Sequence, residues 1–174
     1  MSEYFECTKV GVEFLDQTKN VFVARQVIHA TPDQIFDVFE DAHAWTEWAL
    51  PIEKVEWTSP KPFGVGTTRN VHMMGNMIGY EEFVEWDRGR RMAFSFVGCN
   101  KNVTSKFLED YRVKYIGKGN CQVEWYMAME VNGFSRYMMF LTRPIMRIAN
   151  RRMFKKFKKY VEAYAKGEVS LGSA

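Results

Sequence analysis

The amino-acid sequence predicts an α+β domain in which a curved antiparallel β-sheet wraps around one long C-terminal α-helix, with two short helices between the first and second strands. Three observations support this fold class. Residues 53–131 alternate apolar and polar side chains, as strands do. Residues 136–166 repeat apolar side chains every three or four positions, as an amphipathic helix does. A helix start at Thr31 interrupts the chain after the first strand, and this order of elements is typical of α+β layer folds.

The length of 174 residues fits a single domain. We expect this domain to span residues 21–167, after a lead at 1–20 of uncertain structure and before a flexible tail at 168–174. Aromatic residues make up 16% of the chain, which also contains 11 Met. Both residue types fill cores and line adaptable pockets, so the composition leaves a Met-rich core and a ligand cavity equally open.

The first strand and the short helices have clear boundaries. Residues 21–29 have the alternation of a strand. Thr31 suits the N-cap of a short helix and Pro32 suits its first position, and we expect this helix to end near Asp41. A second short helix is expected over residues 44–50.

The following meander divides at turn residues. Its expected strands are 53–59, 67–74, 77–86, 91–97, 104–116 and 122–131. Gly75-Asn76 fits a two-residue hairpin turn between the second and third of them. The last strand alternates most cleanly, and one of its faces carries Val123, Trp125, Met127, Met129 and Val131.

The long helix is expected at about 136–166, which gives a length of roughly 45 Å. Its apolar positions recur at three- and four-residue spacing: Met138, Leu141, Ile145, Ile148, Phe157, Val161 and Tyr164. Pro144 lacks a backbone donor, so it should kink the helix or split it.

The spacing of the cysteines and the hydropathy of the chain indicate the cellular compartment of the protein. The three Cys are widely spaced and form no CxxC pair, which is typical of reduced thiols. Residues 1–13 contain no sustained apolar run, and no stretch approaches the roughly 18 apolar residues that span a bilayer. We therefore expect a cytoplasmic protein.

Several segments together resemble the START/Bet v 1-like (SRPBCC) superfamily, and within it the bacterial polyketide cyclase/dehydrase and lipid-transport group. The matching text is ATPDQIFDVFEDAHAWTEWALPIEKVEW at 30–57, GVGTTRNV at 64–71, EWDRGRRMAF at 85–94, and the basic C-terminal helix. The resemblance covers about 21–166 and implies a helix-grip fold. It also implies a cavity between sheet and helix, in which members of the superfamily bind lipids, sterols, polyketides or plant metabolites.

The resemblance sets which strand residues face this cavity. Aligning Val84 and Met92 with buried family positions also turns Tyr80 and Glu82 inward. Trp45 and Trp48 fall where family members place the pocket rim, although large aromatics there could equally plug the open end of the sheet. The expected ligand-binding residues are Trp45, Trp48, Trp57, Arg69, Tyr80, Phe94, Phe96, Phe107, Tyr111, Trp125, Met127, Met129, Met138, Leu141 and Ile145.

Arg69 is the most informative single position. The match at GVGTTRNV turns it inward, where a guanidinium would need Glu82, Glu109 or an acidic ligand as its partner. The opposite register would expose Arg69 and turn His72 and Met74 inward, since a one-residue slip reverses a strand.

Motifs for other chemistry are missing from the sequence. The three His (His29, His43 and His72) are scattered, so we expect no metal site. No phosphate-binding glycine loop and no GxSxG nucleophile motif is present. We expect no cofactor.

The C-terminal helix carries most of the positive charge. Residues 136–166 hold ten Lys or Arg and one acid, a charge of +9, so the rest of the +3 chain carries −6. Arg143, Arg147, Arg151 and Lys155 recur every four residues. This stripe is either a solvated face or a contact for an anionic membrane. Nucleic-acid binding is not expected, because the acidic body opposes it.

Three functions remain open from the sequence. The first is binding and carriage of an apolar small molecule, such as a lipid or polyketide. The second is a polyketide cyclase/dehydrase-type enzyme that uses the same pocket, with Arg69, Tyr111 and Glu109 as candidate catalytic residues. The third is an interaction module whose basic helix contacts a partner. The oligomeric state is undetermined.

Overall fold

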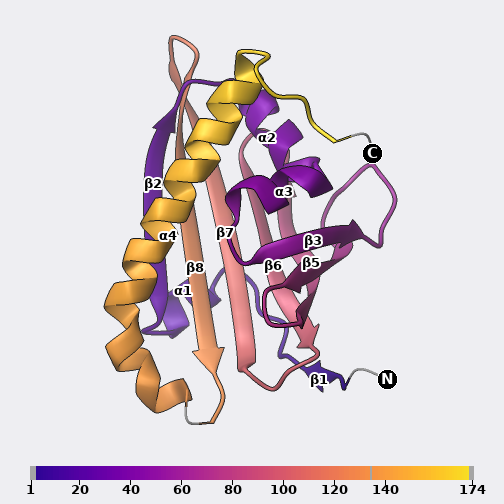
Figure 1. Cartoon of the computed structure of the whole chain (residues 1–174), viewed down its shortest axis with the longest axis vertical. Coiled ribbons are helices and arrows are strands. Elements are labelled where there is room, and N and C mark those ends of the chain that lie inside the picture. The colour runs from indigo at the N-terminus through magenta and orange to yellow at the C-terminus, as the bar shows by residue number, and fades with distance from the viewer. Residues whose placement is uncertain (1–2, 134, 173–174) are drawn as a thin grey trace.

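A computed structural model describes residues 3–133 and 135–172 and places a curved antiparallel sheet against one long helix (Figure 1). The helices are α1 (Phe14–Gln17), α2 (Pro32–Glu40), α3 (Ala42–Trp48) and α4 (Ser135–Ala165). The strands are β1 (Phe5–Glu6), β2 (Val21–Ile28), β3 (Ile52–Trp57), β4 (Thr68–Met73), β5 (Met77–Asp87), β6 (Arg91–Cys99), β7 (Thr104–Gly117) and β8 (Asn120–Val131). The helix-grip fold predicted from the sequence is confirmed.

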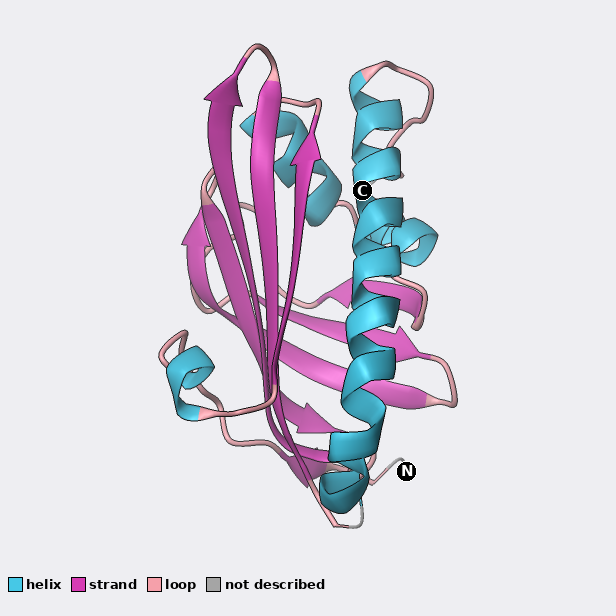
Figure 2. Cartoon of the chain, turned by 90° about the vertical axis from the view of Figure 1, so that its left-hand side faces the viewer, coloured by secondary structure: helices cyan, strands magenta, loops and turns pink. Residues whose placement is uncertain are grey.

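The sheet follows the order β2-β8-β7-β6-β5-β4-β3, and β1 pairs with β6 outside this path. All of the pairings are antiparallel. Figure 2 shows the sheet curving beside α4. Buried side chains of the sheet and of α4 belong to one hydrophobic core. The helices α2 and α3 close one end of the sheet (Figure 1).

The start of α2 forms as the sequence predicts. The Thr31 side chain accepts from the backbone N–H of Gln34, and the Gln34 side chain accepts from the backbone N–H of Thr31. This capping box satisfies two backbone donors at the helix start. Arg88, in the turn before β6, bonds to Asp33, Asp37 and Glu40 and holds α2 against the sheet.

The N-terminal lead covers the convex side of the sheet. Phe14 of α1 is fully buried against Leu108 and Ala128. Tyr4 lies 5.3 Å from the ring of Tyr80. The lead, whose structure the sequence left uncertain, therefore buries part of the outer face of the sheet.

Two residues of the C-terminal tail, which we predicted to be flexible, contact the rest of the fold. The backbone N–H of Gly172 donates to Asp41 at 2.6 Å, and Leu171 packs against the main core. Leu171 and Gly172 therefore lie close to the junction of α2 and α3 at Asp41.

Pro144 was predicted to kink the long helix or to split it. The helix continues through Pro144, so it is not split. Its buried side also differs from the prediction in the first half. Leu141, Ile145 and Ile148 are exposed, while Met139, Asn150 and Phe154 are buried. The first half carries apolar residues on two sides, and only packing against the sheet selects between them. The later positions Phe157 and Val161 are buried as predicted.

The register of β5 also differs from the prediction. Glu81 and Phe83 face the helix side, while Tyr80 and Glu82 face outward. Met73 pairs with Met77, so the turn contains Met74 as well as Gly75 and Asn76. One more residue in the turn shifts the pairing by one position and places Glu81, not Glu82, opposite Arg69.

Candidate functional site

A pocket of about 310 Å³ lies between the concave face of the sheet and α4. Its size is at the lower end of the range for small-molecule sites. Aromatic side chains form much of the wall: Trp45, Trp48, Phe94, Phe96, Phe107, Tyr111 and Trp125. Six of the chain's 11 Met complete it: Met73, Met77, Met127, Met129, Met146 and Met153. The Met-rich composition thus belongs in large part to the lining of a pocket.

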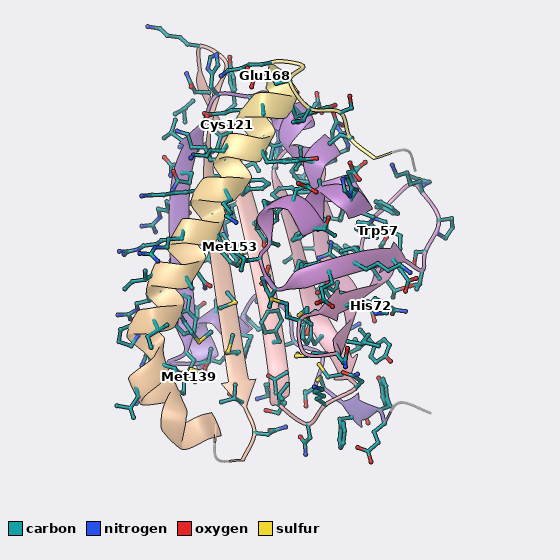
Figure 3. All side chains as sticks on the ribbon, in the orientation of Figure 1. Trp57, His72, Cys121, Met139, Met153 and Glu168 are labelled. Carbon is teal, nitrogen blue, oxygen red and sulfur yellow. The ribbon has the colours of Figure 1, made fainter. Side chains whose placement is uncertain are left out.

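Arg69 is a fully buried cation in the wall of this pocket, at 1% exposure. It lies on β4 directly opposite Glu81 of β5, and its Nε donates to Glu81 Oε2 at 2.5 Å. Adjacent strands bring these opposite charges together, and the pair offsets part of the cost of burying each charge. The alternative register is wrong, because Met74 is exposed and His72 bonds to Glu56 at the surface (Figure 3).

Aromatic rings surround the Arg69 guanidinium. Its Cζ lies 4.1 Å from the centre of the Trp45 ring, 4.6 Å from Phe94 and 5.2 Å from Trp57. Such contacts stabilise a cation that has lost its water.

Two donor groups of Arg69 remain unused. Nη1 and Nη2 are buried and have no hydrogen-bond partner among the described residues. Nε1 of Trp48, another pocket residue, is also buried without a partner in this part of the chain. Unsatisfied buried donors are rare because each lost hydrogen bond costs free energy. They mark a place where a bound molecule can supply acceptors.

A protonatable pair lies in the same wall. The hydroxyl of Tyr111 donates to Oε2 of Glu109 at 2.6 Å. Burial raises the pKa of Glu109 to about 8, against the opposing effect of this hydrogen bond. Burial also raises the pKa of Tyr111 well above its usual value. Near neutral pH, the Glu109 carboxyl therefore holds its proton and adds little negative charge to the pocket.

The charge of Glu81 is set by two opposing effects. Burial raises the pKa of the Glu81 carboxyl, and the adjacent Arg69 guanidinium acts in the opposite direction. Burial is the larger of the two effects, so the pKa of Glu81 lies above its usual value.

Most of the predicted ligand-binding residues line the pocket. Those that do are Trp45, Trp48, Arg69, Phe94, Phe96, Phe107, Tyr111, Trp125, Met127 and Met129. Glu109, a candidate catalytic residue, also lines it. Trp57 instead packs against Phe63 and beside Arg69, so it supports the wall from behind.

Three further predicted residues do not face the pocket. Tyr80 is turned outward by the register of β5, and it packs on Tyr4. Leu141 and Ile145 point to solvent because the opposite side of α4 packs on the sheet. The side chain of Met138 lies outside the described residues.

Sequence reasoning missed Glu81, Met146, Asn150 and Met153, which all line the pocket. A hairpin with three residues in the turn would have paired Arg69 with Glu81. Met146, Asn150 and Met153 follow each other at four- and three-residue spacing. This spacing places them on one side of the helix, and it could have identified that side as the one facing the sheet.

The described part of the chain contains no group of three or more His, Cys, Asp or Glu residues that could hold a metal ion. Cys7, Cys99 and Cys121 are buried free thiols. The ionisable side chains in the pocket wall are Arg69, Glu81, Glu109 and Tyr111.

Comparison with known proteins gives one family match and several structural neighbours. The family model described as "Polyketide cyclase / dehydrase and lipid transport" matches residues 20–162. An uncharacterized protein of Mycobacterium tuberculosis is 41% identical over 159 residues, covering 91% of this chain and 95% of that protein. An uncharacterized protein of Mycobacterium bovis matches to the same extent.

Solved structures with low identity share the fold. TTHA0849 from Thermus thermophilus has a TM-score of 0.67 at 18% identity, covering 83% of this chain and 99% of that one. The Zhui aromatase/cyclase from a Streptomyces species has a TM-score of 0.65 at 13% identity, covering 87% and 96%. A START superfamily protein from Mycobacterium smegmatis has a TM-score of 0.60 at 11% identity, covering 86% and 99%.

Proposed function

The chain belongs to the polyketide cyclase/dehydrase and lipid transport family, and we propose that it binds and carries an apolar small molecule with a hydrogen-bond acceptor at one end. The observation that carries this proposal is the pair of unused Arg69 donors in an otherwise apolar pocket. A site with apolar walls and few polar contacts is typical of small-molecule binding.

Affinity would come mainly from burial of the ligand's carbon atoms. Apolar surface removed from water contributes about 25 cal/mol per Å². Met side chains from both the sheet and the helix, such as Met127 and Met153, adapt to ligands of different shape. The pocket walls therefore favour an apolar ligand but do not require one particular ligand shape.

Orientation would come from Arg69. Nη1 and Nη2 can donate to a carbonyl or carboxylate oxygen, which would replace the hydrogen bonds that these atoms lack. Protonated Glu109 would not repel such an acceptor near neutral pH. We therefore infer a ligand whose polar end is a ketone, an ester or a carboxylic acid.

The first test is direct detection of the ligand. Native mass spectrometry of the protein purified from its own host should show a co-purified small molecule of lipid or polyketide type. Binding of a fluorescent fatty acid should then be measured by titration. A pocket that is empty after purification and that also refuses the fatty acid would contradict the proposal.

The second test asks whether Arg69 orients the ligand. Arg69→Met alone would leave Glu81 buried without a partner, at a cost of about 3–5 kcal/mol, so the double variant Arg69→Met, Glu81→Met is used. It should bind the fatty acid at least tenfold more weakly while its affinity for a hydrocarbon probe stays the same. The matched control is Arg25→Met, Glu124→Met, an ion pair at the surface. Equal loss for both probes would mean that Arg69 supports the fold and not the ligand.

A cyclase or dehydrase activity is the second candidate. Its specific support is the Glu109–Tyr111 pair, since an acid with a pKa of about 8 can give or take a proton near neutral pH. Arg69 would stabilise negative charge that develops on a ketone oxygen. Glu109→Gln should then abolish turnover of a poly-β-ketone substrate and leave its binding intact. If the wild-type protein binds such a substrate and leaves it unchanged, the carrier function stands.

A further inference from the structure

The outer side of α4 exposes an apolar stripe that the pocket does not use. Leu141, Ile145 and Ile148 are 62%, 67% and 53% exposed. Their spacing of four and then three residues places them on one line along the helix. The pocket instead uses the other side of the helix, through Met146 and Met153. Figure 3 labels Met153 on α4. Large aliphatic side chains gathered on one exposed line are typical of an interaction surface.

The same line becomes basic further along the helix. Continuing at spacings of four, three and four residues, it carries Arg152, Lys155 and Lys159, which are all exposed. Arg147 and Arg151 are exposed beside it. None of these five side chains forms an ion pair with a described residue. The surface is thus apolar at one end, basic at the other, and free of internal charge partners over the described chain.

We propose that this face of α4 docks the protein on an anionic lipid surface. Aliphatic side chains of an amphipathic helix enter the region between headgroups and acyl chains. Each Lys or Arg close to an anionic surface strengthens binding roughly fivefold. The +9 charge of residues 136–166 is complementary to such a surface. No helix among the described residues combines the length and hydropathy needed to cross a bilayer, so the contact is peripheral.

A second copy of this chain fits the face less well. A symmetric contact along Leu141, Ile145 and Ile148 would bring Arg147 and Arg151 of the two copies together, with no acidic residue exposed nearby on the helix to balance them. Like charges held close repel each other, whereas anionic headgroups neutralise them.

Docking would place α4 between the bilayer and the pocket. The helix covers the pocket with Met146, Asn150 and Met153, and its opposite side carries the exposed stripe. The docking itself does not depend on the ligand proposed above, because it rests on the outer side chains alone.

The test is co-sedimentation with vesicles of phosphatidylcholine, with and without phosphatidylserine. We expect binding only where phosphatidylserine is present, and a loss of binding as salt concentration rises. The variant Leu141→Gln, Ile145→Gln, Ile148→Gln should bind at least tenfold more weakly. The variant Arg147→Gln, Arg151→Gln, Arg152→Gln should lose on the order of a hundredfold.

Matched controls change equally exposed groups on other elements. Val65→Gln, Met74→Gln, Ile116→Gln removes exposed apolar side chains, and Lys114→Gln, Lys118→Gln removes exposed charges. Both control variants should bind vesicles as the wild-type protein does. Circular dichroism and the fatty-acid titration should be the same for all of the variants.

Three results would overturn the docking. One is equal binding of the wild-type protein to both kinds of vesicle. Another is unchanged binding of either helix variant. The third is a wild-type dimer in analytical ultracentrifugation that the Leu141, Ile145 and Ile148 changes convert to a monomer, since a second copy would then cover the stripe.

Discussion

Arg69 shows how one residue organises the site. A guanidinium cannot lose its charge by burial, so its position forces the surroundings to supply counter-charge and ring contacts. Glu81 supplies the charge, and Trp45 and Phe94 supply the nearest rings. Because only Nε is used by Glu81, the two Nη atoms stay available to a ligand.

Glu109 should make the stability of the protein depend on pH. Its pKa of about 8 in the folded state lies above the ordinary value of 4.5, so the folded protein binds this proton more tightly than the unfolded chain. The stabilisation is complete below about pH 4.5 and is lost as the pH rises through about 8. The loss should be on the order of a few kcal/mol.

Urea denaturation at a series of pH values measures this effect. Glu109→Gln keeps an acceptor for Tyr111 and cannot ionise, so its free energy of unfolding should fall less between pH 5 and pH 8 than that of the wild-type protein. Glu53→Gln, at an exposed position, should leave the wild-type slope unchanged. Parallel curves for Glu109→Gln and the wild-type protein would show that Glu109 does not carry this proton.

The spacing of apolar residues predicts the buried face correctly in some elements of this chain and not in others. The face of β8 with Trp125, Met127 and Met129 follows directly from alternation. In β5 the same rule fails, because the turn before it contains one more residue than Gly75-Asn76 and because the pairing with β6 shifts twice along the strand. In α4, apolar residues lie along two sides of the helix. Their three- and four-residue spacing alone does not show which side packs against the sheet.

The buried side of α4 can be tested by paired truncations. Phe157 is fully buried against Phe39, Trp48 and Phe154, so Phe157→Ala should lower the free energy of unfolding by about 3–5 kcal/mol. Ile148→Ala removes an exposed side chain and should change it by less than about 0.5 kcal/mol. Thermal or urea unfolding of both variants gives the comparison, and similar losses for the two would contradict this orientation of the helix.

On the scale of the whole molecule, the sheet is covered on its concave side and on part of its convex side. The helix α4 and the short helices α2 and α3 pack on the concave side, where the pocket lies. The N-terminal lead covers part of the convex side through Phe14 and Leu15. The lead lies outside the family match, which begins at residue 20, and is nevertheless integrated into the fold.

The contribution of the lead should be visible in stability. Phe14→Ala would leave a cavity above Leu108 and Ala128, and it should cost about 3–5 kcal/mol of unfolding free energy. Val65→Ala, at a position 69% exposed, is the control and should have little effect. Both are measured by urea denaturation. A Phe14→Ala protein as stable as the control would mean that the lead rests on the sheet without stabilising it.

The sequence by itself determined the kinds and order of the elements from β2 onward, the capped start at Thr31 and the apolar face of β8. These features depend on residues close together in the chain, whose spacing and backbone preferences are local. The tertiary structure decided that Glu81 pairs with Arg69, which side of α4 meets the sheet, and that Phe14 covers the convex face. These three features depend on contacts between segments that are distant in the sequence. One additional residue in a turn changes which side chains of two strands pair, and the side of a helix that packs on the sheet determines which of its residues are buried.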